Sequence, residues 1–342
     1  MDNYQQVLLQ MAEFGIELRD SKDLPLKVDT SKRITCGKGG KDWYRLYLFR
    51  PDAGGSYLTG SYGTYRHGGD WRKVAVDWAP LSEAERKRLA AERLAARAVA
   101  DAARQVEIDF ARGTAADQWR QGARTGTSAY LARKLVEPEA CRFMADGSIL
   151  VPMLRYDLPV AERLRGLQRI HSEQRLDWKT GEALPAKVFT KNFDMPGCAL
   201  RLGEVVADSN LLLVCEGYAT GLTLRMALDR AVPVFLSFTA GNMENVVPLL
   251  RELYPQCVML ICADDDWQTR AQFTGELTNP GKTVAKKMAK ATARCDYTYP
   301  IFAPETRQPK DTDFNDLHLR QGLDAVREQV AGVVGEIVRL YG

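Results

Sequence analysis

The chain has 342 residues, of which 45% are hydrophobic and 27% are charged, and this excludes a disordered tail protein, a collagen-like chain and a disulfide-dense miniprotein. Its net charge of +3 is unevenly divided, with an excess of positive charge up to residue 205 and an excess of negative charge beyond it. That division suits a protein that holds a polyanion with one part and divalent cations with another.

No apolar run is long enough to span a bilayer, and the first residues lack a signal-peptide pattern. We therefore expect a cytoplasmic protein without membrane contact. The seven cysteines are scattered and form no CxxC pair, so no zinc site is expected. Cys257 and Cys262 flank an apolar run and are predicted to be reduced core thiols.

Residues 1–80 are predicted to form a small β-rich domain that binds nucleic acid. A short amphipathic helix around Val7 and Met11 precedes two strand patterns, at residues 43–49 and 56–62. Residues 60–71 hold too many glycines for a core strand, and their aromatic rings alternate with basic side chains, a mixture that can stack bases and contact phosphates. The candidates for stacking on bases are Tyr62, Tyr65 and Trp71. Packing in a small core is the alternative role for these rings.

Residues 81–117 are predicted to be a long helical linker. Ser82 and Glu85 have the spacing of a capping box, and Gly113 is expected to end the helix. Positive and negative charges are balanced along it, which favours a solvated spacer over a binding helix.

A further unit is expected over residues 118–207, and the clearest pattern follows it, over residues 208–342. There, strands of continuous apolar residues alternate with helices, which indicates parallel βαβ units with both faces of the sheet covered. The strands are expected at residues 211–215, 232–238, 257–262 and 297–299, and the helices at residues 219–229, 243–254 and 283–294.

Acidic residues follow two of these strands. Glu216 comes directly after the first strand, and Asp264, Asp265 and Asp266 come shortly after the third. Because parallel strands end at the same edge of a sheet, we expect these carboxylates to converge. Clustered carboxylates raise one another's pKa unless a cation compensates, so the pattern predicts Mg²⁺ or Mn²⁺. Solvated loop acids are the alternative.

The segments Leu213–Gly221 and Ala263–Asp266 together resemble the Toprim domain, the metal-binding α/β module of bacterial-type primases, topoisomerases and some nucleases. Three more segments resemble the version found in plasmid-transfer and phage primases of the TraC type, at residues 238–243, 279–282 and 312–317. Residues 129–134 and 147–153 resemble the subdomain that precedes Toprim in primase cores. The resemblance implies an α/β fold in which a mixed α+β primase subdomain and the small β-rich domain precede a parallel Toprim sheet flanked by helices.

The resemblance also implies roles for individual residues. Glu216, Asp264 and Asp266 would be the catalytic metal ligands, with Asp265 in a variable middle position. Asp313 and Asp316 either add a ligand or cap the helix that begins near Leu317. The basic residues that would bind the template and nucleotides are Lys134, Arg169, Lys187 and Lys191.

The implied activity is that of a DNA primase, which joins ribonucleoside triphosphates into a short primer on single-stranded DNA. A helicase or another replication protein is a further expected partner. Many bacterial primases carry an amino-terminal zinc-binding module, and none is visible here. Two alternatives stay open: a Toprim nuclease, which would not need residues 118–205, and a non-catalytic single-stranded DNA-binding accessory protein, which would not need clustered carboxylates.

Overall fold

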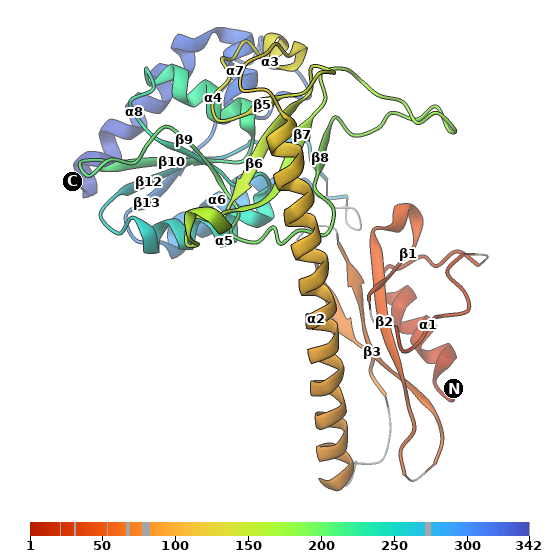
Figure 1. Ribbon diagram of the computed structural model, residues 1–342. Helices are drawn as coiled ribbons and strands as arrows, with labels where there is room; N and C mark the ends of the chain where they lie inside the picture. Colours follow the sequence, from red (N-terminus) through yellow and green to blue (C-terminus); the bar gives the residue numbers. More distant parts are fainter. Residues whose placement is uncertain are drawn as a thin grey trace. The chain divides into compact units, whose positions relative to one another are not determined.

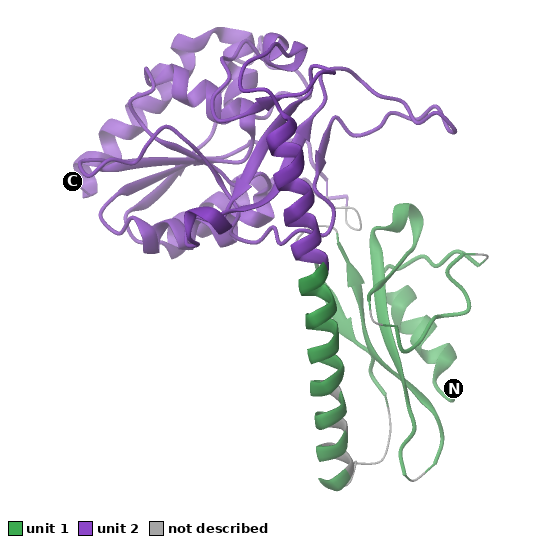
Figure 2. Ribbon diagram, viewed as in Figure 1, with its two compact units in different colours: residues 1–106, 271–274 green, residues 107–270, 275–342 purple. Residues whose placement is uncertain are grey.

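The computed structural model describes residues 1–341 with the exception of residues 21, 31, 53, 66–68, 77–82 and 271–274. The chain divides into two compact units, which are distinguished by colour in Figure 2. The first unit comprises residues 1–106 and the second comprises residues 107–270 and 275–342.

The first unit is built on an antiparallel sheet with the strand order β1–β2–β3–β4 (Figure 1). Its elements are α1 (Tyr4–Glu13), β1 (Ile34–Cys36), a 3-10 turn (Lys38–Gly40), β2 (Asp42–Phe49), β3 (Tyr57–Thr64) and β4 (Trp71–Lys73). Val7 and Met11 of α1 pack in one core with Leu46 and Leu58 of the sheet. The β-rich front, its first helix and its two long strands were predicted and are confirmed.

Strand β3 continues into the glycine-rich stretch, which differs from the prediction. A Cβ at Gly60 would lie 2.1 Å from the carbonyl oxygen of Arg45, and the φ of Gly60 is +129°. The glycine therefore lets β2 and β3 approach closely instead of ending the strand. Tyr62 is only 3% exposed, and its ring meets that of Phe14 edge-on at 5.5 Å. This burial corrects the prediction that Tyr62 stacks on template bases.

Helix α2 (Glu83–Gln121) passes through Gly113, which was expected to end it. Glycine inside a helix costs only about 1 kcal/mol relative to alanine. Ala111 and Ala115, on either side of Gly113, are buried in the core of the second unit, and this packing offsets that cost. The division between the two units falls within this helix, after Val106. The predicted capping residue Ser82 lies outside the described residues.

After the last part of α2, the second unit continues with helix α3 and a four-stranded antiparallel sheet in the order β5–β6–β7–β8. These elements are α3 (Ala129–Lys134), β5 (Arg142–Phe143), β6 (Ile149–Leu154), a 3-10 turn (Val160–Glu162), β7 (Leu164–Ile170) and β8 (Lys187–Phe189). Ile149 and Ile170 belong to the same hydrophobic core as Leu213 and Leu222. Residues 118–207 and 208–342, predicted as separate domains, therefore share a core.

The larger sheet has the strand order β13–β12–β10–β11–β9. Its strands are β9 (Leu200–Leu202), β10 (Leu211–Cys215), β11 (Val234–Leu236), β12 (Val258–Cys262) and β13 (Cys295–Thr298). Four strands are parallel as predicted, and β9 pairs antiparallel with β11 at one edge. The α/β class is confirmed, with an antiparallel edge strand that the sequence did not indicate.

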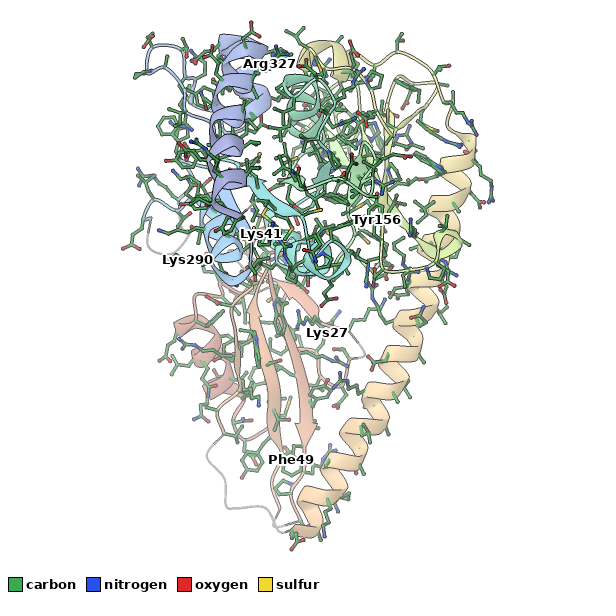
Figure 3. All side chains as sticks on the ribbon, turned by 90° about the vertical axis from the view of Figure 1, so that its left-hand side faces the viewer. Lys27, Lys41, Phe49, Tyr156, Lys290 and Arg327 are labelled. Atoms are coloured by element: carbon green, nitrogen blue, oxygen red, sulfur yellow. The ribbon has the colours of Figure 1, made fainter. Side chains whose placement is uncertain are left out.

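Helices cover both faces of this sheet (Figure 1). One face packs against α4 (Tyr218–Ala227), α7 (Phe314–Gln321) and α8 (Leu323–Tyr341), and the other packs against α5 (Ala240–Leu253) and α6 (Pro280–Ala291). Alternate strand residues serve the two layers: Leu213 belongs to the first and Leu212 to the second. Arg327 of α8, labelled in Figure 3, donates to the carbonyl oxygen of Ala227 at 2.9 Å and so ties α8 to the end of α4.

All seven cysteines are free, and six of them are buried. The prediction that Cys257 and Cys262 are reduced core thiols is confirmed. Among the described residues, no helix combines the length and apolar character needed to cross a membrane.

Candidate active site

Glu216 and Asp264 leave the large sheet at the same edge. Cys215 and Cys262, the last residues of β10 and β12, are partners in the parallel register. The chain therefore places Glu216 one residue, and Asp264 two residues, beyond paired strand ends. Helix α4 begins immediately afterwards, with Gly217 in an extended conformation as its N-cap. The edge predicted for the carboxylates is the edge that they occupy.

The carboxylates at this edge act on one another electrostatically. Burial raises the pKa of Glu216 to about 7, and the negative charges of Asp266 and Asp313 add to the effect. Burial also raises the pKa of Asp264 well above its ordinary value, with further contributions from Asp313, Glu216 and Asp266. These four residues, termed the carboxylate cluster below, therefore concentrate negative charge that proton or cation binding would relieve.

Asn279 fixes the loop that carries Asp266. It is the N-cap of α6, and its Oδ1 accepts hydrogen bonds from the backbone N–H of Lys282 at 3.2 Å and of Asp266 at 3.0 Å. Its Nδ2 donates to Oδ1 of Asp265 at 2.6 Å. One side chain thus caps a helix and holds two consecutive residues of the acidic loop.

Gly281 brings the start of α6 against the same loop. Its N–H donates to Oδ2 of Asp266 at 3.0 Å. A Cβ at this position would lie 2.4 Å from the carbonyl oxygen of Asp264, so only glycine allows this approach without a shift. The neighbouring Pro280 occupies the first turn of α6, where its missing N–H costs nothing. The sequence Asn-Pro-Gly-Lys at residues 279–282 therefore positions Asp264 and Asp266.

Asp265 has a structural role that sequence reasoning missed. Asp265 is only 6% exposed. Its Oδ2 lies 2.9 Å from Nη2 of Arg307, and its Oδ1 lies 3.5 Å from Nζ of Lys282. Its backbone N–H donates to the carbonyl oxygen of Thr312 at 2.7 Å. Asp265 therefore links the acidic loop to α6 and to the segment before α7. No sequence signal singled out Arg307, which lies in a loop outside the quoted motifs.

Asp313 and Asp316 form a reciprocal capping box at the start of α7. Oδ1 of Asp313 accepts from the N–H of Asp316 at 2.8 Å, and Oδ2 of Asp316 faces the N–H of Asp313 at 3.4 Å. The capping role is thus present, and Asp313 also contributes charge to the carboxylate cluster. Burial and the charge of Asp316 raise the pKa of Asp313, while Lys134 opposes them.

Comparison with known proteins agrees with this arrangement. Residues 211–324 match the family model of the Toprim domain. The chain contains a Toprim domain. A segment of 128 residues, 36% of this chain, is 36% identical to one DNA primase TraC of Escherichia coli and 32% identical to another. This segment spans only 12% and 8% of the lengths of those relatives.

Solved primase structures also resemble the chain at low sequence identity. The primase fragment of the bacteriophage T7 primase-helicase protein matches with 15% identity and a TM-score of 0.36, covering 61% of this chain and 74% of that one. The Aquifex aeolicus primase, with zinc-binding and RNA polymerase domains, matches with 11% identity and a TM-score of 0.38, covering 97% of this chain and 84% of that one.

Toprim domains bind divalent cations, and the donors present here fit that property. Oδ1 of Asp264 is buried and has no hydrogen-bond partner among the described residues, so an oxygen ligand is available. Within the described ranges no group of three or more His, Cys, Asp or Glu side chains is arranged so that it could hold a metal ion. Mg²⁺ does not require such a group, because it usually keeps several waters and takes one or two carboxylates together with substrate phosphates.

Two of the predicted basic residues act electrostatically on carboxylates at this edge, Lys134 on Asp313 and Lys187 on Glu216 and Asp264. Nζ of Lys134, at the end of α3, lies 3.2 Å from Oδ1 of Asp316. The positive charge of Lys187, in β8, lowers the pKa of Glu216 and of Asp264 against the larger effect of burial. The structure thus brings basic side chains of the preceding subdomain beside the acidic edge.

The other predicted basic residues have different surroundings. Arg169 of β7 donates to Oγ of Ser148 at 2.8 Å and to Oδ2 of Asp146 at 2.7 Å, so its guanidinium is held by the turn between β5 and β6. Lys191 follows β8 and is exposed. In the first unit, Tyr65 and Trp71 are 51% and 55% exposed, in contrast to the buried Tyr62.

Proposed function

We propose that the protein is a DNA primase that joins ribonucleotides into a short primer on single-stranded DNA. The observation that carries the proposal is the carboxylate cluster with Lys134 and Lys187 beside it in one compact unit. Template-directed polymerisation needs oxygen ligands for divalent cations and positive groups for polyanionic substrates at the same place. The sequence identity to TraC primases over the matched segment supports the same activity.

In this proposal Glu216, Asp264 and Asp266 hold Mg²⁺ or Mn²⁺, and Asp313 is a further oxygen donor. When bound, such a cation activates the primer 3′-hydroxyl and neutralises charge on the leaving pyrophosphate. Gly281 keeps one oxygen of Asp266 in a fixed position through its N–H. Lys134 and Lys187 reduce the negative potential at the site, which lets a nucleoside triphosphate approach the carboxylates.

The first unit supports template binding in this scheme. Tyr65 and Trp71 present exposed rings, and successive bases of a single strand stack on such rings. A helicase or another replication protein would act with the primase at the same template.

The test is incubation of the purified chain with single-stranded circular DNA and labelled ribonucleotides, with Mg²⁺, with Mn²⁺ and with EDTA. We expect short RNA products that require the metal and disappear in Glu216→Gln. The matched control is Glu204→Gln, which changes an exposed glutamate of the same unit. Conversion of the circle to linear or shorter DNA without ribonucleotide incorporation would identify a nuclease instead, and DNA binding without either product would identify an accessory protein.

A further inference from the structure

The chain between β7 and β8, residues 171–186, forms a hairpin arm. Figure 1 shows it extending away from the sheets of the second unit. Backbone hydrogen bonds of 2.8 Å join its two sides: His171 to Ala186, Leu184 to Arg175 and Asp177 to Glu182. At the turn, Oδ1 of Asp177 accepts from the N–H of Lys179 at 2.8 Å, and Gly181 has a φ of +70°. The arm therefore holds its shape through its own bonds.

The tip of the arm carries an unexplained aromatic side chain. Trp178 is 87% exposed, more than any other large hydrophobic residue among those described. At that exposure the ring belongs to no core, so its aromatic face is open to a partner. Nζ of Lys179 lies 5.0 Å from the centre of its ring. An aromatic face beside a lysine is the combination that stacks a base and contacts the adjoining phosphate.

The arm carries mixed charge, with Arg175 and Lys179 positive and Glu173, Asp177 and Glu182 negative. The carboxylate of Asp177 is used by the turn, and that of Glu173 lies 3.8 Å from Nη1 of Arg133. Glu182 is exposed, and Lys179 stands at the tip. The base of the arm is β8, where Lys187 acts electrostatically on Glu216. The arm thus leads from the carboxylate cluster to an exposed ring with a positive neighbour.

We infer that the hairpin arm binds the single-stranded DNA template, with Trp178 stacking on a base and Lys179 contacting a phosphate. The inference rests on the proposed function, and it assigns a template contact outside the carboxylate cluster. It also gives a role to a segment that none of the quoted primase motifs includes.

The test measures binding of the full chain to fluorescently labelled oligo-dT by anisotropy. Trp178→Ala is expected to raise the Kd about five- to a hundredfold, the range that loss of one stacked base produces. Trp178→Phe should restore most of the affinity, because phenylalanine keeps an aromatic face. Lys179→Ala should reduce the slope of log affinity against log salt by about 0.7. The matched control is Val160→Ala, which shortens another highly exposed apolar side chain of the unit and should leave binding unchanged.

Primer synthesis by the unaltered chain separates failure of this inference from failure of the proposed function. If that chain makes primers and Trp178→Ala binds oligo-dT as tightly, the inference is overturned while the function stands. If that chain makes no primers and Trp178→Ala still loses affinity, the arm binds DNA in a protein that is not a primase. If Trp178→Ala binds DNA like the unaltered chain but elutes at a different volume in size-exclusion chromatography, the arm is a contact between protein chains, which also overturns the inference.

Discussion

Asp264 and Asp265 are neighbours in the chain and meet opposite electrostatic environments. Asp264 faces Glu216, Asp266 and Asp313, and one of its buried oxygens has no hydrogen-bond partner among the described residues. Asp265 contacts Arg307, Lys282 and Asn279, so that its charge is compensated within the protein. Neighbouring acids can therefore have different roles. An acid without an ion-paired basic side chain in the described part of the chain, such as Asp264, is available to bind a ligand, whereas an acid paired with basic side chains, such as Asp265, holds the loop in place.

The largest effect on activity is expected from Asp264→Asn. Removing this proposed metal ligand should reduce primer synthesis at least about a thousandfold, because bound cations supply several kcal/mol of transition-state stabilisation. The free energy of unfolding should stay within about 1 kcal/mol or rise, since one repelling charge is lost. Synthesis and urea denaturation, measured on the same preparation, check both statements. Primer synthesis at the unaltered rate would remove Asp264 from the site.

Asp265→Ala should show the reverse order of effects, with stability affected first. It leaves Arg307 and Lys282 without their carboxylate in a partly buried setting, at a cost of about 2–3 kcal/mol. Thermal unfolding should therefore shift down by several degrees. Asp265→Asn keeps a polar oxygen for Asn279, so its unfolding temperature should lie between those of Asp265→Ala and the unaltered protein. If Asp265→Ala melts like the unaltered protein, the contrast between the neighbouring aspartates is wrong.

Gly281→Ala tests how the loop is positioned without touching a carboxylate. The added methyl group would meet the carbonyl oxygen of Asp264, and we expect a loss of about 1–3 kcal/mol in stability together with reduced synthesis. The matched control is Gly241→Ala in α5, where a Cβ has open space; alanine there should stabilise the helix by up to about 1 kcal/mol. If Gly281→Ala and Gly241→Ala have the same stability and the same rate of primer synthesis, α6 can shift freely.

The smallest effect concerns a compensated acid in the first unit. Hydrogen bonds from the Arg19 side chain lower the pKa of Asp23 to about 2, against the opposing effect of burial. This stabilisation is fully present above the ordinary carboxyl pKa near 4 and is lost as the pH falls towards 2. Asp23→Asn should therefore cost about 1–2 kcal/mol at pH 7 and almost nothing near pH 2. Urea denaturation at the two pH values measures the difference, and an equal cost at both would exclude a charge-dependent role.

Local patterns were enough to predict much of the second unit. The continuous apolar runs that became β10 and β12 were located to within a residue, because buried parallel strands need no alternation. Glu216 and Asp264 then followed from the rule that parallel strands end together. The apolar runs are local in sequence, and the common edge of parallel strands follows from sheet geometry. Neither depends strongly on the rest of the chain.

Features that depend on distant segments were missed. Tyr62 is buried because Phe14, far away in sequence, packs on its ring. Helix α2 passes Gly113 because Ala111 and Ala115 are buried in the core of the second unit. Asp265 is compensated by Arg307, a contact that no spacing rule contains. Such outcomes are decided by tertiary packing, which overrides local preference.

The burial of the cysteines has a consequence for chemical labelling. Thiol reagents attack the thiolate, and burial raises the pKa of Cys36, Cys198 and Cys295 to about 12, so the folded chain should react slowly. Cys36 is the single cysteine of residues 1–106, whereas the other six lie between residues 141 and 295. Alkylation of Cys36 therefore reports opening of the first unit, and alkylation of the five buried thiols other than the half-buried Cys141 reports opening of the second. Mass spectrometry of timed labelling would follow the two events separately in one unmodified sample.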